Sequence, residues 1–166
     1  MTTVTFWAPG IPRQKGNHIA FCPRSRDFHR AHSSPCRPII TEDPERGKRC
    51  REWEQAIRVA SREVAPPWPF TGRCSLYVDL FVPRPKKYAK TPLPSRSPAD
   101  LDKMIRAIGD ALQTKTKEPG YIVVDDSQFT KISAEVHWAD CEGHERGAGA
   151  MISVESHEPQ QQELIR

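Results

Sequence analysis

The sequence predicts a single α/β (α+β) domain in which two main helices pack against one mixed β-sheet. The chain has 166 residues, which is the size of one domain. Several segments alternate apolar and polar residues with a period of two, and two segments show helical periodicity. Read along the chain, these segments follow the order βαβαβββ, which favours one mixed sheet with helices packed against it.

The first third of the chain predicts a strand, a long basic loop and a helix. Alternation over residues 2–8 predicts a strand that ends at Pro9-Gly10. A loop is expected over residues 11–40, which contain four prolines and three histidines. A helix is expected over residues 44–64, where apolar residues recur at helical spacing: Trp53, Ile57, Ala60 and Val64.

The remaining chain predicts four strands and a second helix. The clearest strand covers residues 73–82, where every second residue is apolar and Pro83 follows. The helix is expected over residues 100–113, with a buried stripe of Leu101, Ile105, Ile108 and Leu112. Further strands are expected over residues 121–124, 127–138 and 150–154. The domain should therefore span residues 1–156, and the polar residues 157–166 should form a frayed tail.

Composition excludes several classes of protein. No apolar run approaches the ~20 residues of a membrane span, and the N-terminus lacks the pattern of a signal peptide. The five cysteines form no C-x-x-C pair, so neither a zinc knuckle nor a disulfide framework is indicated. No phosphate-cradling glycine loop is present, so a nucleotide cofactor is not expected. These features favour a cytoplasmic protein with reduced thiols and no membrane partner.

Positive charge is concentrated in two segments, although the net charge is only +4. Residues 9–40 carry six Arg or Lys against one Asp, and residues 84–96 carry five and no acid. Such clustering suits a polyanion such as nucleic acid, although solvated loops can also be basic. The basic residues expected to contact DNA are Arg13, Lys15, Arg24, Arg26, Lys86, Lys87 and Lys90.

Two aspartates stand at the start of the second predicted helix. The simpler interpretation of Asp100 and Asp102 is a helix cap and a partner for the helix dipole. Within a continuous helix their side chains would point about 200° apart. If Asp100 is instead the N-cap or the last extended residue, both carboxylates can converge on a shared proton or a cation. Arg106 and Asp110 follow at intervals of four and lie near the same helical face.

A second acidic pair, Asp125-Asp126, lies between two predicted strands. The simpler interpretation is a hairpin turn, in which Asp is common. However, three or more carboxylates without His or Cys ligands form a hard oxygen site that suits Mg²⁺ or its substitute Mn²⁺. Carboxylate-held magnesium beside basic loops is typical of enzymes that cleave phosphodiester bonds.

These motifs resemble the RusA family of Holliday-junction resolvases from phages and bacteria. The shared pattern is D-L-D-x-x-x-[K/R]-x-x-x-D-A-L followed after a turn by D-D-x-Q, here 100–112 and 125–128. The N-terminal strand and its proline-rich basic continuation also look like the opening of the family. The resemblance covers about residues 3–138.

The resemblance implies roles for individual residues. Asp100, Asp102 and Asp126 match the family's magnesium-binding catalytic aspartates, with Asp110 and Asp125 as supporting acids. Arg106 occupies the position of a catalytic lysine; it keeps the positive charge but cannot readily donate a proton. Further departures are Lys103 in place of Asn, a longer turn over residues 113–123, and Glu135 and His137 where a basic residue is often found.

The sequence thus predicts a Mg²⁺-dependent endonuclease that resolves branched DNA, such as four-way junctions, in a bacterial or phage-infected cell. A four-way junction needs two symmetric nicks and the chain has residues for one metal site, so a homodimer is expected. The apolar stripe Trp53, Ile57 and Ala60 is a candidate dimer surface, although burial in the core explains it equally well. The alternatives are a DNA-binding protein without catalysis and a nuclease specific for flaps or forks.

Overall fold

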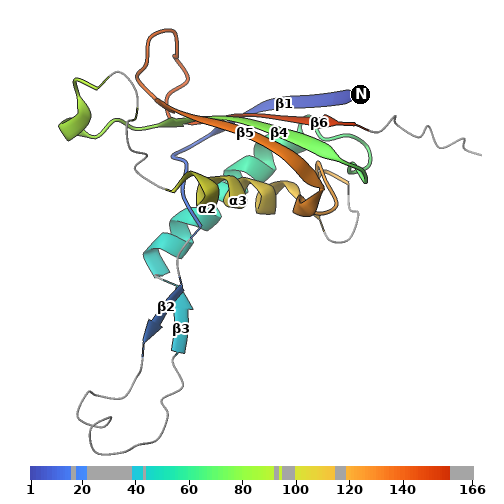
Figure 1. The fold of residues 1–166 in the computed structure, drawn as a ribbon, viewed down its shortest axis with the longest axis horizontal. Helices are drawn as coiled ribbons and strands as arrows, with labels where there is room; N and C mark the ends of the chain where they lie inside the picture. The colour runs from blue at the N-terminus through green and yellow to red at the C-terminus, as the bar shows by residue number, and fades with distance from the viewer. Residues whose placement is uncertain are drawn as a thin grey trace, which may run out of the picture.

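A four-stranded sheet in the order β1-β6-β4-β5 forms the centre of the protein (Figure 1). Its strands are β1 (Thr2–Pro9), β6 (Gly149–Ser156), β4 (Cys74–Val82) and β5 (Phe129–Trp138). β6 is antiparallel to both of its neighbours, whereas β4 and β5 are parallel. The sheet is therefore mixed, as predicted. This computed structural model describes residues 1–15, 18–21, 39–42, 44–91, 94, 100–114 and 119–157.

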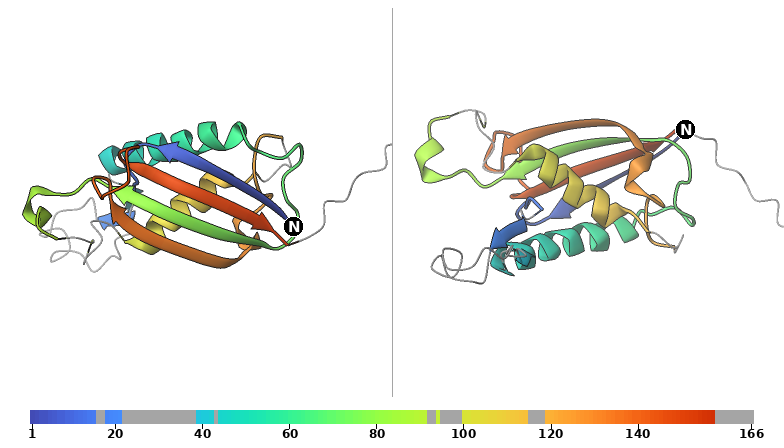
Figure 2. Two further views of the ribbon diagram at one scale, coloured as in Figure 1. Left: turned by 90° about the horizontal axis from the view of Figure 1, so that it is seen from above. Right: turned by 60° about the horizontal axis from the view of Figure 1, so that its bottom comes forward.

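Two helices, α2 (Pro44–Arg62) and α3 (Leu101–Leu112), cover one face of the sheet, as the two views of Figure 2 show. α3 lies in the crossover between the parallel strands β4 and β5, a connection that parallel pairing requires. Both helices lie within two residues of the predicted bounds. The single α+β domain predicted from periodicity is confirmed.

The core lies between this sheet face and the helices. Alternate residues of β4 point into it, and Leu76, Val78 and Leu80 are all buried. α3 contributes an apolar stripe that includes Ile108 and Leu112, while α2 contributes Trp53 and Ile57, which are 2% and 0% exposed. Each such side chain contributes about 1.5–3 kcal/mol on full burial. The stripe on α2 therefore belongs to the core, and its use as a dimer surface is excluded.

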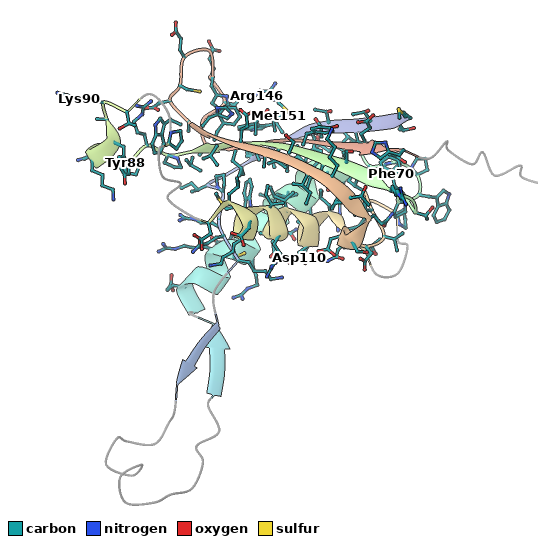
Figure 3. The ribbon with its side chains drawn as sticks, in the orientation of Figure 1. Phe70, Tyr88, Lys90, Asp110, Arg146 and Met151 are labelled. Atoms are coloured by element: carbon teal, nitrogen blue, oxygen red, sulfur yellow. The ribbon has the colours of Figure 1, made fainter. Side chains whose placement is uncertain are left out.

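Among the residues that the structure describes, the loop of residues 139–148 is what lies over the opposite face of the sheet, called here the open face (Figure 1). Trp7 of β1 and Phe81 of β4 lie on this face and contact His144 of the loop, with ring centroids 5.3 and 3.7 Å away. Figure 3 shows Arg146 and Met151 on this side and Asp110 on the helical side. The two faces therefore separate an aromatic surface from the acidic residues of α3.

Three local expectations are wrong. Residues 18–21 and 39–42 form a short antiparallel pair, β2 (His18–Phe21) with β3 (Ile39–Glu42), so 11–40 is not loop throughout. Residues 121–124 form no strand; Val123 makes only isolated bridges, to Phe70 and Gln113. Residues 126–128 form a 3₁₀ turn, so β5 begins at Phe129.

The cause of the second error is visible in the backbone contacts. The amides of Ile122 and Val123 both donate to Leu112 O at the end of α3, at 3.1 and 3.2 Å. On the other side, Phe70 N donates to Ile122 O at 2.8 Å. The apolar run is buried by a helix end and a loop, which satisfy its backbone without a sheet.

No helix within the described ranges is long and apolar enough to cross a membrane. At the C-terminal end, His157 still bonds to the sheet: its amide donates to Arg73 O, and its Nε2 lies 2.7 Å from Ser75 Oγ. The remainder of the predicted tail lies outside the described residues.

Candidate active site

Asp100 occupies the N-cap position of α3, in extended conformation (φ −67°, ψ 119°). Its carbonyl accepts the first helical bonds from Lys103 N and Met104 N, both at 3.1 Å. Its carboxylate makes no capping bond and lies 2.5 Å from Lys103 Nζ. The side chain of Asp100 is therefore not used to cap the helix, and the simpler interpretation of this residue does not hold.

Asp102 and Arg106 lie on the exposed face of α3, and Asp126 meets the helix on its third turn. At Gly109 an added Cβ would stand 3.4 Å from Asp126 Cβ and 3.7 Å from its Oδ2. Asp126 therefore packs against α3 at Gly109, with room for no side chain larger than a methyl group between them. Asp126 thereby comes against the helix that carries Asp102 and Arg106.

The D-D-S-Q segment is built as a small capped turn. Asp125 caps it, with its Oδ1 accepting from Ser127 N at 2.9 Å. Gln128 completes a capping box by accepting from Asp125 N at 2.8 Å. The Gln128 amide also donates to Phe70 O and Gly72 O, at 2.9 and 2.7 Å. Asp125 and Gln128 therefore shape the turn, which places Asp126 toward α3.

Asp100 and Asp102 lie at the start of α3, whereas Asp126 packs against its third turn from outside the helix. Seven residues separate Asp102 from Gly109, or about 10 Å along the helix axis. Among the described residues, Asp100, Asp102 and Asp126 do not form a group whose ligand atoms lie within 4.8 Å of one another. Asp100 and Asp102 thus form one end of an acidic strip on α3, Asp126 forms the other, and Arg106 lies between them. Their role as metal ligands stays a prediction.

Lys15, which the sequence suggested as a DNA contact, forms an ion pair with Asp110 of α3 instead. Its ammonium also lies in the field of Glu54 on α2. The hydrogen bond to Asp110 raises the pKa of Lys15 above its ordinary value, against the opposing effect of burial. The positive charge of Lys15 is therefore balanced within the protein.

The second basic segment is anchored by Arg84. Its Nε donates to Asp140 Oδ1 at 2.8 Å, its Nη1 donates to Thr91 O at 2.6 Å, and its guanidinium covers the ring of Trp138. Trp138 Nε1 also donates to Thr91 O at 3.0 Å. These contacts fold the loop so that three lysines are exposed: Lys86, Lys87 and Lys90. Figure 3 shows Tyr88 and Lys90 at the end of the molecule where α3 begins.

Three further DNA contacts were predicted in the first basic segment. Arg13 is half-buried and directly precedes Gln14, and Arg24 and Arg26 lie outside the described residues.

A separate group of metal-ligating side chains lies on the open sheet face. Asp79 and Glu135 are register partners on β4 and β5, and His137 Nε2 lies 3.8 and 3.6 Å from their carboxylates. Their ligand atoms lie within 4.8 Å of one another, so the group could hold a metal ion. It faces away from the helices, because Asp79 pairs with Met151 on the open face. It is therefore distinct from the acidic strip on α3.

Sequence reasoning missed the glutamines that support the acidic strip. Gln14 Oε1 accepts from Asp100 N at 2.9 Å, and Gln113 Oε1 accepts from Asp126 N at 3.3 Å. A weak signal existed for Gln113, which follows Asp110 by three residues on a predicted helix. No local signal existed for Gln14, whose partner lies 86 residues away in the sequence.

Comparison with known proteins gives one family match. A family model described as Endodeoxyribonuclease RusA matches residues 37–145, a range that contains α2, α3 and the acidic strip. The match begins after the N-terminal strand and the first part of the basic loop. No curated protein matches the chain.

Proposed function

Because this chain belongs to the endodeoxyribonuclease RusA family, we propose that it is a Mg²⁺-dependent enzyme that resolves four-way DNA junctions by paired nicks. Membership follows from the match over residues 37–145, which is well over half of the 166-residue chain. The protein is accordingly an endonuclease that acts on DNA phosphodiester bonds. Beyond family membership, we propose three things: the metal ion, the branched DNA substrate and the assembly of two chains.

One observation carries the proposal: Asp126 packs at Gly109, on the helix that bears Asp102 and Arg106. The other polar residues of the D-D-S-Q segment are used to build its turn, whereas Asp126 points toward the helix. An acidic strip that includes a guanidinium can bind the phosphate that is to be cleaved. A metal held by the carboxylates and the guanidinium of Arg106 can both contact the oxygens of that phosphate.

The donor set suits magnesium in its chemistry, although one ion shared by all three aspartates requires the two ends of the strip to approach each other. Asp100, Asp102 and Asp126 offer only carboxylate oxygens, which suit a hard cation, and the N-terminus of α3 lowers the repulsion between the first two. The Asp100 carboxylate makes no capping hydrogen bond. Its ion pair with Lys103 has to break before the carboxylate binds a cation. When bound, the metal would activate a water for in-line attack and neutralise charge on the leaving oxygen.

The remaining residues then have distinct tasks. Arg106 is exposed between the two ends of the strip, where its guanidinium stabilises the negative charge of the pentavalent phosphorus. The exposed Lys86, Lys87 and Lys90 lie on a loop that Arg84 holds in place, and they grip phosphates without reading base sequence.

A panel of branched DNAs tests the proposal. Purified protein is incubated with a four-way junction, a flap, a fork and a linear duplex, each with Mg²⁺ and with EDTA. We expect paired nicks in the four-way junction with Mg²⁺ and none with EDTA. Binding that survives EDTA without any nicking would favour a DNA-binding protein, and preferential cutting of flaps or forks would assign a different specificity.

We also propose that the active form is a homodimer. Two symmetric nicks require two sites, and one chain carries one acidic strip. The pairing surface is not the Trp53–Ile57 stripe, because these residues lie in the core. Light scattering at micromolar concentration measures the assembly, and a monomer that still makes coordinated paired nicks would contradict the proposal.

A further inference from the structure

The segment that follows β1 is bonded to α3 at three points. Gln14 Oε1 accepts from Asp100 N at 2.9 Å, and Lys15 N donates to Lys103 O at 3.3 Å. The third bond joins the Lys15 ammonium to the Asp110 carboxylate. Two consecutive residues therefore hold α3 both at its first turn and at its third turn.

From Asp110, two further hydrogen bonds lead to Asp126 at the far end of the acidic strip. Asp110 Oδ1 accepts from Gln113 Nε2 at 3.0 Å, and Gln113 Oε1 accepts from Asp126 N at 3.3 Å. The Gln113 amide has both of its polar atoms engaged, which sets its orientation. The order Lys15, Asp110, Gln113 and Asp126 is thus a continuous chain of hydrogen bonds that ends at a proposed metal ligand.

Charge and burial distinguish Lys15 from the exposed lysines. Its side chain is 41% exposed and that of Asp110 is 21% exposed, so the pair is partly shielded from water. Glu54, which is 15% exposed on α2, adds a second negative charge to its surroundings. A phosphate that bound Lys15 would have to displace Asp110 and approach both carboxylates, which is electrostatically unfavourable.

We propose that Gln14 and Lys15 are positioning residues that align the two ends of the acidic strip, Gln14 through Asp100 and Lys15 through Asp110 and Gln113. The inference rests on the proposed function, because it gives these residues a role in the same site. Lys15 is on this view not a DNA contact. Its effect on catalysis is indirect and comes from where it holds Asp126.

The test compares Lys15→Met, Lys15→Arg and Asp110→Asn with Lys131→Met. Lys131 lies on the open sheet face above Tyr77, so its variant matches the charge change away from the site. Junction affinity, the single-turnover rate at saturating DNA and hydrogen exchange of the Asp126 amide are measured for each. Urea unfolding confirms that each variant is folded.

We expect Lys15→Met and Asp110→Asn to lower the single-turnover rate by up to about 10²-fold, the scale of a misplaced reacting group. Both should also speed exchange at Asp126, while junction affinity stays within about two-fold. Lys15→Arg should retain the protection of the Asp126 amide and most of the rate, because arginine keeps a positive charge beside the Asp110 carboxylate. Lys131→Met should behave as wild type.

Two results would overturn the inference. The first is a loss of junction affinity in Lys15→Met together with a smaller salt dependence, which marks a phosphate contact. The second is unchanged Asp126 exchange in both Lys15→Met and Asp110→Asn. If the wild type cleaves no branched DNA, the proposed function fails, and the exchange measurement still decides whether Lys15 holds Asp126.

Discussion

Asp126 approaches α3 at Gly109, where the Asp126 Cβ stands 3.4 Å from the place that a Cβ of Gly109 would occupy. The two residues come from different parts of the fold, since Asp126 belongs to the turn before β5. Their contact brings a carboxylate to a helix face that already carries Asp102 and Arg106.

Gly109→Ala should be tolerated, and Gly109→Leu should not. A methyl group at 3.4 Å makes ordinary van der Waals contact with Asp126, and alanine gains up to about 1 kcal/mol in a helix relative to glycine. A leucine side chain would need the space that Asp126 occupies. We expect unchanged or higher urea stability with retained nicking for alanine, and lost nicking for leucine. Equal activity of the two variants would show that Asp126 does not act from this position.

Asp102→Asn and Asp126→Asn should each abolish cleavage and leave junction binding intact or tighter, because the carboxylates repel phosphate when no metal is bound. Asp79→Asn is the matched control, since Asp79 lies on the open sheet face with the other group of potential metal ligands. Nicking assays and band shifts in EDTA measure the two properties. Near-wild-type nicking by Asp102→Asn or Asp126→Asn would remove that residue from the metal site.

Arg106→Lys should keep much of the activity, and Arg106→Ala should lose most of it. The expected role of Arg106 is to supply positive charge at the phosphate, which lysine retains. The single-turnover rate on a four-way junction at saturating protein is the measurement. Equally high rates for both variants would make Arg106 an ordinary exposed helix residue.

Replacing Lys86 and Lys87 with Met should weaken junction binding and reduce its salt dependence. Each lost phosphate contact lowers the slope of log K against log salt by about 0.9 on B-form DNA. Arg84→Ala should instead destabilise the loop, because Arg84 holds Asp140 and Thr91. Fluorescence anisotropy at several salt concentrations and thermal unfolding separate these effects. An unchanged slope in the double variant would place the DNA path elsewhere.

The Lys15–Asp110 pair should stabilise the fold at neutral pH and lose its effect only in strong alkali. Asp110 raises the pKa of Lys15 above 10.5 in the folded state. A raised folded-state pKa gives stability that is fully present below the unfolded pKa and is lost as the pH rises through the folded value. The difference in unfolding free energy between wild type and Lys15→Met should be about 1 kcal/mol or less, because the pair is partly exposed. This difference in unfolding free energy should stay constant up to about pH 10 and shrink above that. If the difference fell between pH 7 and 9, the raised pKa of Lys15 would not be its cause.

The elements with strong local periodicity were predictable from the sequence. β4 alternates apolar residues on one face, and Trp53, Ile57, Ile105, Ile108 and Leu112 are buried as their helical spacing predicts. Val64, predicted as the last residue of the α2 stripe, is 39% exposed because α2 ends at Arg62. The acidic motifs were equally visible, because Asp100, Asp102 and Asp126 stand out as carboxylates at element ends.

The tertiary structure decided which charged residues are available and which are engaged. Lys15 and Arg84 lie in the two basic segments, and nothing in the local sequence separates Arg84 from the exposed lysines that follow it. Their partners are distant: Asp110 lies 95 residues from Lys15, and Asp140 lies 56 residues from Arg84. The same holds for the contact of Asp126 with Gly109. Periodicity reports which face of an element is buried, whereas a specific ion pair or close approach depends on how separate elements pack together, and only the folded chain determines that.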